Sequence, residues 1–180
     1  MKFYLETERL ILREFQKNDI EGIFELDSNP EVHKYLGNNP ITTHKQAEDN
    51  IAFIQEQYKE RGIGRFACIE KASGNFIGWS GLKLNQGEKE TLNGFTNFID
   101  IGYRLIPRFW GKGYASESAF ACLDFGFKKM NYDFIYGAAD VENIGSNKIL
   151  QKIGLHYVND FVFEGHKAKW YELKKSDYEQ

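Results

Sequence analysis

The stretch Arg-Phe-Trp-Gly-Lys-Gly-Tyr-Ala, residues 108–115, decides how the rest of the chain is organised. Residues 100–106 before it, Asp-Ile-Gly-Tyr-Arg-Leu-Ile, have the composition of a strand, which Pro107 ends because proline cannot donate to a sheet ladder. After it, small and apolar residues recur every four positions, which is typical of one face of a helix: Ala115, Ala119, Leu123 and Phe127. The sequence therefore predicts a strand, a tight turn and a helix.

The glycines of this turn indicate a site for an anion. Gly111 and Gly113 can adopt positive φ, so that successive backbone N–H groups converge on one point. The same point is the start of the predicted helix, where the first N–H groups have no internal partner and the helix dipole is positive. Arg108 and Lys112 add positive charge. The stretch contains neither G-x-x-x-x-G-K-S/T nor G-x-G-x-x-G, and a turn that merely reverses the chain is the alternative.

Length and composition set the bounds on the class of protein. The chain has 180 residues, of which 42% are hydrophobic and 16% aromatic, without a membrane-length apolar run, so we expect one domain over residues 1–180. Its net charge of -3 argues against general nucleic-acid binding and suits a cationic acceptor. Charged residues interrupt the first nine positions too early for a secretory segment, and we expect a cytoplasmic protein that does not bind membranes.

Cysteine and histidine usage gives no sign of a metal site. Cys68 and Cys122 each lie in an apolar context, and we expect buried free thiols rather than a disulfide or a nucleophile. The histidines are scattered without ligand spacing, at positions 33, 44, 156 and 166, so we expect no metal.

The remaining elements follow from apolar spacing, caps and turn residues. Before the turn, the sequence predicts a strand at 9–13, helices from 18, from 29 and from 43 or 44 to about 61, a hairpin of 66–71 with 75–84, and an exposed loop at 85–97. After it we expect a buried strand at 134–139, a helix capped by Asn143 and closed by Gly154, and strands at 156–163 and 168–173. This order predicts a mixed α/β or α+β sheet with helices packed on it.

Several motifs in this order resemble the GNAT N-acetyltransferase superfamily. The turn matches its acetyl-CoA pyrophosphate loop, Gln/Arg-x-x-Gly-x-Gly/Ala, at Arg108, Gly111 and Gly113, and Tyr-Ala-x-Glu follows at residues 114–117. The stretches Thr-Glu-Arg-Leu-Ile-Leu-Arg at 7–13, Asn-Pro-Glu-Val at 29–32 and Asn-x-x-Ser-x-x-x-Leu-x-Lys-x-Gly at 143–154 look like the branch of ribosomal-protein N-terminal (alanine/serine) acetyltransferases.

The resemblance implies a fold and a cofactor site. A mostly antiparallel central sheet splays after its fourth strand, helices cover both faces, and the pantetheine arm of acetyl-CoA lies in the splay. Backbone groups near residues 103–106 pair with pantetheine, and the turn holds the pyrophosphate. The implied cofactor residues are Tyr103, Leu105, Ile106, Arg108, Trp110, Gly111, Lys112, Gly113, Tyr114, Ala115, Asn143 and Asn147.

Transfer from a thioester to an amine needs a base for the amine and an acid for the departing thiolate. Asp100 stands where many family members carry a glutamate base, and the alternative is an ordinary surface carboxylate. Asn143 caps a helix and, by resemblance, also contacts the cofactor or orders water. Many relatives place a tyrosine acid seven residues later, but this chain has Leu150, which leaves Ser146 or a water as the acid; an exposed helix serine is the alternative.

The expected function is acetyl-CoA-dependent N-acetylation of a primary amine, including a protein N-terminal α-amine, by direct attack within a ternary complex. A non-catalytic acyl-CoA-binding or sensing module is one alternative, and an acetyltransferase for a small amine such as an antibiotic or a polyamine is another. We expect residues 31–61 and 85–97 to shape the acceptor pocket, and a monomer or homodimer. Turnover with an amine panel separates enzyme from binding module, because only an enzyme releases free thiol.

Overall fold

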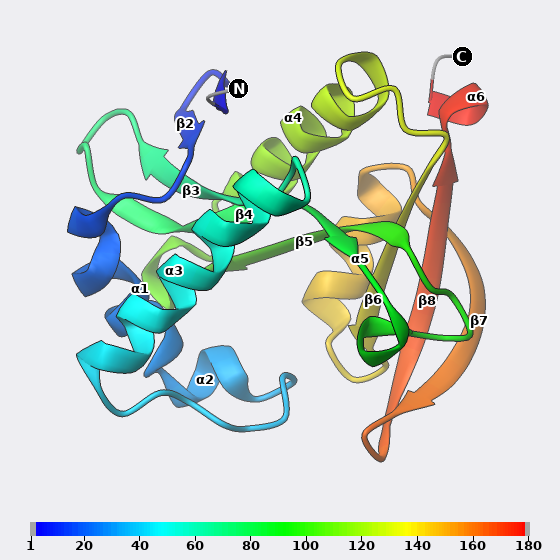
Figure 1. Cartoon of the computed structure of the whole chain (residues 1–180), viewed down its shortest axis with the longest axis horizontal. Helices are drawn as coiled ribbons and strands as arrows, with labels where there is room; N and C mark the ends of the chain where they lie inside the picture. The colour runs from blue at the N-terminus through cyan, green and yellow to red at the C-terminus, as the bar shows by residue number, and fades with distance from the viewer. Residues whose placement is uncertain (1–2, 179–180) are drawn as a thin grey trace.

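The computed structural model describes residues 3–178 and contains one eight-stranded sheet (Figure 1) with strand order β1-β2-β3-β4-β5-β6-β8-β7. Neighbouring strands are antiparallel except β5 and β6, which are parallel. The strands are β1 (Tyr4–Glu6), β2 (Leu10–Arg13), β3 (Arg65–Glu70), β4 (Phe76–Asn85), β5 (Phe98–Leu105), β6 (Phe134–Asp140), β7 (His156–Phe163) and β8 (His166–Lys174).

The helices begin within two residues of their predicted starts, apart from the short C-terminal helix, which was not predicted. They are α1 (Ile20–Asp27), α2 (Pro30–His33), α3 (His44–Glu60), α4 (Tyr114–Lys128), α5 (Ile144–Lys152) and α6 (Lys175–Tyr178), with short 3-10 turns η1 (Lys17–Asp19), η2 (Glu88–Glu90) and η3 (Pro107–Phe109). The side chains of Asn29, Thr43 and Asn143 each accept a hydrogen bond from a backbone N–H of the first helical turn. Gly154 ends α5 with a φ of 98°, a conformation that favours glycine.

The predicted strands are present, and one further strand was not predicted. β1 is only three residues long and pairs with β2, so the sequence before residue 9 offers little alternation to reveal it. β5 begins at Phe98, earlier than the predicted start at Asp100, because the side chains of Phe98 and Ile99 are buried.

The sheet opens between β5 and β6, where the only register pair is Asp100 with Tyr136. Beyond this pair the two strands diverge, with α5 beside the gap (Figure 1). β5 is the fourth of the strands predicted from sequence, so the predicted splay after the fourth strand is confirmed at this place.

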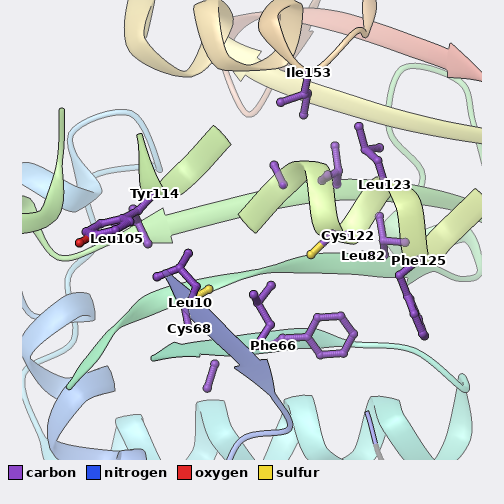
Figure 2. Close-up of a cluster of buried hydrophobic side chains, with 14 of the residues drawn as sticks. Leu10, Phe66, Cys68, Leu82, Leu105, Tyr114, Cys122, Leu123, Phe125 and Ile153 are labelled. Atoms are coloured by element: carbon purple, nitrogen blue, oxygen red, sulfur yellow. The ribbon is translucent and has the colours of Figure 1, made fainter. Parts of the chain in front are cut away.

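Helices cover both faces of the sheet, as predicted. Figure 2 shows Cys122, Leu123 and Phe125 of α4 on one side of β3 and β4, while α3, drawn in cyan, lies on the other. Cys122 and Cys68 are fully buried free thiols, and burial raises the pKa of the Cys122 thiol to about 12. Neither cysteine is therefore a thiolate near neutral pH. Among residues 3–178, no helix is both long and apolar enough to cross a membrane.

Candidate functional site

A cleft of about 1100 Å³ extends from the splay between β5 and β6. Its walls come from β5, from the turn before α4, from the start of α5, from the loop after α2 and from the β7–β8 hairpin. Most of the residues predicted to carry chemistry line this cleft: Asp100, Tyr103, Leu105, Trp110, Gly111, Gly113, Tyr114, Ala115, Asn143 and Ser146.

The turn formed by residues 111–115, called the glycine turn below, presents backbone to the cleft. Gly111 and Gly113 have φ of 71° and 83°, both in the left-handed region that favours glycine. Gly113 is the N-cap of α4 and has no side chain with which to cap the helix. The N–H of Glu117 is bonded to the carbonyl of Gly113, so the N–H groups of the three residues between them belong to the uncapped first turn. Free N–H groups at a helix N-terminus and the positive end of the helix dipole are the features that favour an anion.

Arg9 holds the glycine turn from outside the cleft. Its guanidinium donates to the Lys112 carbonyl at 2.9 Å and to Glu117 Oε2 at 2.7 Å, and it lies over the Tyr114 ring at 4.4 Å. Glu117 also accepts from the Arg9 backbone N–H at 2.8 Å and from the Thr7 hydroxyl. Although burial opposes its charge, these hydrogen bonds hold the pKa of Glu117 below its usual value. Arg9 was not predicted as a support, although residues 7–13 and 114–117 both belong to the motifs quoted above.

β5 offers backbone groups to the splay at alternate residues. Ile106 donates its N–H to Ile77 of the neighbouring segment at 2.9 Å and is buried, so it does not reach the cleft. Because donors and acceptors alternate along a strand, Tyr103 and Leu105 direct their backbone groups to the open edge. The carbonyl of Leu105 accepts from the Trp110 indole at 2.7 Å, in agreement with this direction.

The structure does not bring Arg108 or Lys112 to the cleft. Arg108 forms an ion pair with Glu25 of α1, which holds its guanidinium away from the glycine turn. The Lys112 ammonium lies over the Phe109 ring at 5.2 Å, and only its backbone belongs to the turn. The positive charge that the sequence indicated at this rim is thus directed elsewhere.

Asn147 also lies outside the cleft lining. Its amide nitrogen donates to the carbonyls of Asp140 and Asn143, at 2.8 Å each, and its oxygen accepts from the Tyr171 hydroxyl at 2.7 Å. Asn147 therefore fixes α5 against β6 and β8, and these bonds use both ends of its amide.

Asp100 lies in the cleft with both carboxylate oxygens engaged. Oδ2 accepts from Arg65 at 2.8 Å, and Oδ1 accepts from the Asn85 side chain at 3.0 Å. Arg65 also donates to the backbone carbonyls of Asp100 and Gly81. These partners come from β3 and β4, and no local sequence signal linked either of them to Asp100.

Ser146 lies at the start of α5 and faces Tyr103. Its backbone N–H donates to the Asn143 side chain at 3.1 Å, which is the predicted cap. The Tyr103 hydroxyl donates to the Ser146 carbonyl at 2.9 Å, and its oxygen is 3.2 Å from Ser146 Oγ. Burial raises the pKa of Tyr103, so this phenol stays protonated at neutral pH. Leu150 is buried and has no hydroxyl to contribute.

The remaining walls are mostly apolar and come from segments far apart in the chain. We call six of these residues the apolar wall: Tyr35, Leu36, Trp79, Leu92, Phe161 and Phe163. Among residues 3–178 there is no group of three or more His, Cys, Asp or Glu side chains that could hold a metal ion.

Comparisons with known proteins identify the family of the chain. A family model described as an acetyltransferase (GNAT) domain matches residues 9–156. An uncharacterized N-acetyltransferase, p20, of Bacillus licheniformis is 36% identical over 149 residues, which cover 83% of this chain and 80% of that protein.

Solved structures share the fold. A GNAT-family acetyltransferase from Bacillus anthracis has a TM-score of 0.79 at 24% identity, with 97% of this chain and 99% of that chain covered. A spermidine N-acetyltransferase from Vibrio cholerae, in complex with CoA and spermine, has a TM-score of 0.76 at 21% identity, with 97% of this chain and 100% of that chain covered. At these identities the likeness concerns the fold.

Proposed function

The chain belongs to the GNAT acetyltransferase family, and we propose that it transfers the acetyl group of acetyl-CoA directly to a primary amine within a ternary complex. The observation that carries this proposal is that one cleft contains both the anion-binding glycine turn and the Asp100 carboxylate. Cys68 and Cys122 do not line this cleft and are fully buried, which supports direct attack over a cysteine-linked intermediate.

Acetyl-CoA is the acetyl donor, and the glycine turn is the proposed site of its pyrophosphate. Four of the turn's residues line the cleft, and the N–H groups of the last two belong to the uncapped first turn of α4: Gly111, Gly113, Tyr114 and Ala115. The outward backbone groups of Tyr103 and Leu105 would then hydrogen-bond the pantetheine arm as an added strand would. The Trp110 indole, at the cleft edge, already donates to the Leu105 carbonyl, which leaves the second lone pair of that oxygen and the outward backbone groups of Tyr103 for the ligand.

Asp100 is the proposed base for the amine. Each of its oxygens accepts one hydrogen bond, so each retains acceptor capacity for an ammonium or a water. A water bound there could pass the amine proton to the carboxylate, because aspartate is one methylene shorter than the glutamate of many relatives. Arg65 and Asn85 would keep the carboxylate in one orientation during this transfer.

Ser146 is the proposed acid for the departing thiolate, with an ordered water as the other source of the proton. Tyr103 and Asn143 fix the serine by bonds to its carbonyl and N–H. Tyr103 faces α5, whereas Asp100 lies on the other face of β5, since side chains alternate along a strand. The amine would therefore lose its proton on one side of the strand and the sulfur would gain one on the other.

The acceptor class is a primary amine. The motif order supports a protein N-terminal α-amine, and the fold shared with a spermidine N-acetyltransferase supports a small-molecule amine as the second candidate. Either acceptor would enter along the apolar wall, which lines the part of the cleft that the proposed cofactor path leaves free.

The test is release of free CoA thiol by the purified chain with acetyl-CoA and a panel of primary amines, with the acetylated amine identified by mass spectrometry. We expect thiol and acetylated amine in equal amounts. Binding of acetyl-CoA without thiol release from any amine would instead support the acyl-CoA-binding module. Incubation with acetyl-CoA alone controls for slow hydrolysis.

A further inference from the structure

We propose that the acceptor carries an uncharged apolar or aromatic group next to its amine, and that the site disfavours polyamines; this rests on the proposed transfer to an amine. The proposal follows from how the apolar wall is made and from how the charges near it are paired. The same chemistry is available from a small arylalkylamine or from a peptide that begins with an apolar residue.

Trp79 of the apolar wall lies on the face of the sheet that carries Asp100. In the β4–β5 register Trp79 pairs with Arg104, and Lys83 pairs with Asp100. Cross-strand partners share a face, and residues four apart on a strand share it too. Trp79 and Asp100 therefore lie on one face, and an amine at Asp100 would place its substituent near the indole.

Phe161 forms a rigid part of the apolar wall. Its ring packs edge-on against Trp170 at 5.8 Å and 90°, and Trp170 is 1% exposed. Trp170 is itself stacked against Phe95 at 5.2 Å and Tyr136 at 5.3 Å. A preformed surface of this kind binds an apolar group without first ordering its own side chains.

The charged groups nearest to Trp79 on this face are already paired. Asp100 is bonded to Arg65, and Asp27 of α1 accepts from Arg104 at 2.7 Å. Both guanidiniums also lie near the Trp79 ring, at 5.4 Å for Arg65 and 5.1 Å for Arg104. The negative face of the indole, which would otherwise attract an ammonium, thus has two cations beside it.

A polyamine needs carboxylates for its further ammonium groups, and the apolar wall offers none. Its further ammonium groups must each meet a carboxylate or remain in water, because an unpaired buried charge is costly. Besides Asp100 and Asp140, the carboxylates that line the cleft are Glu31 and Glu164, and both of these residues are exposed at its rim. Asp140 lies at the end of β6, about four residues along the sheet from the register pair of Asp100, and its Oδ1 already accepts from the Glu142 N–H at 2.8 Å. An uncharged ring, in contrast, would replace water on the apolar wall.

The experiment compares kcat/KM for four amines with the purified full chain and saturating acetyl-CoA: phenethylamine, phenylalanine amide, hexylamine and spermidine. We expect phenethylamine or phenylalanine amide to exceed spermidine by about tenfold or more, and hexylamine to lie between them. Phenethylamine ahead of phenylalanine amide would indicate a small-molecule acceptor, and the reverse order an N-terminal α-amine. Spermidine as the best acceptor would overturn the proposal.

Matched variants on β7 locate the effect. Phe161→Ala should lower kcat/KM for the aromatic amines about tenfold, leave spermidine nearly unchanged and keep the KM for acetyl-CoA. Val162→Ala is the control, because Val162 is the next residue, is 69% exposed and does not line the cleft. Equal losses for all amines in Phe161→Ala would contradict the proposal.

A second readout separates this inference from the proposed function. Calorimetric titration of the same amines into the CoA-loaded protein should show the aromatic amines binding more tightly than spermidine. Absence of turnover with every amine, together with this order of binding, would refute the transfer and leave the specificity of the cleft standing. Transfer with spermidine preferred would refute the specificity alone.

Discussion

The glycine turn and the apolar wall line the same cleft but present different groups to it. The glycine turn presents backbone N–H groups from one short segment. The apolar wall presents side chains from four separate segments, which are the loop after α2, strand β4, the 85–97 loop and strand β7. A site made of consecutive backbone groups is encoded locally and changes little when neighbouring side chains change. A site made of distant side chains can be altered at single positions, which is what a family with one donor and many acceptors requires.

The largest effect is expected from a substitution in the glycine turn. Gly113→Val should abolish measurable acetyl-CoA binding, because a β-branched residue opposes a φ of 83° and blocks the ligand's approach. Isothermal titration measures this. Gly74→Val is the control, since Gly74 has a φ of 72° in the β3–β4 turn with open space around it, and it should lose stability but not binding. Near-normal affinity in a folded Gly113→Val protein would refute the site.

The next largest effect is expected at the Asp100 carboxylate, which lines the same cleft as the glycine turn and the apolar wall. Asp100→Asn should lower kcat roughly 10²-fold, the scale of a positioned acid or base, with little change in acetyl-CoA affinity. The deficit should shrink as the pH rises, because amines with a pKa of about 8 to 10.4 then deprotonate unaided. A pH–rate profile against Asp49→Asn, an exposed aspartate on α3, measures both. Unchanged turnover across the range would leave ordered water as the base.

A smaller effect concerns the support of the glycine turn. Glu117→Gln should lower the free energy of unfolding by about 1 to 2 kcal/mol at neutral pH, through its bonds to Arg9 and Thr7. The folded pKa of Glu117 lies below its unfolded value, so this stability is present above about pH 4.3 and is lost as the pH falls through the folded pKa. Denaturant titrations at several pH values should show the difference from wild type shrinking in acid.

The exposed Glu56 on α3 provides the control, and Glu56→Gln should be nearly neutral at every pH. Acetyl-CoA affinity should fall a few-fold in Glu117→Gln only. A difference that grows in acid would contradict the account of Glu117.

The smallest effect tests the claim that backbone N–H groups, and not the charged side chain of Arg108, bind the pyrophosphate. Arg108→Ala should weaken acetyl-CoA binding by less than about fivefold, since an exposed ion pair contributes about 0 to 1 kcal/mol and Arg108 is held by Glu25. Glu25→Gln, which releases the guanidinium, is the matched variant. A large loss for CoA but not for pantetheine in Arg108→Ala would mean that the side chain leaves Glu25 for the phosphates.

The parts of the site formed by neighbouring residues could be predicted from the sequence, and the contacts between distant segments could not. The glycine turn, the Asn143 cap and the strand before the turn depend on residues close in sequence, and the structure contains each of them. The partners of Asp100 could not be inferred, because Arg65 and Asn85 reach it only once three strands are aligned. The orientation of Arg108 likewise depends on a residue of α1, 83 positions away in the chain.

The fold was predictable where apolar spacing and caps were strong. Helix α3 and the β3–β4 hairpin lie within two residues of their predicted bounds, and α4 contains the four apolar positions predicted for its face. The short strand β1 was missed because three residues carry too little periodicity. The Arg9–Glu117 bond joins segments 108 residues apart, so motifs at both ends could be seen while their contact could not.

The most direct test of the central claim is to observe the backbone amides of the glycine turn while CoA is added. In two-dimensional ¹H–¹⁵N spectra of the full chain, we expect the largest shifts at Gly111, Gly113, Tyr114 and Ala115. Pantetheine, which lacks the pyrophosphate, should leave these four amides nearly unchanged while it shifts Tyr103 and Leu105. Largest shifts elsewhere, or equal shifts of the turn with both ligands, would contradict a backbone site for the pyrophosphate.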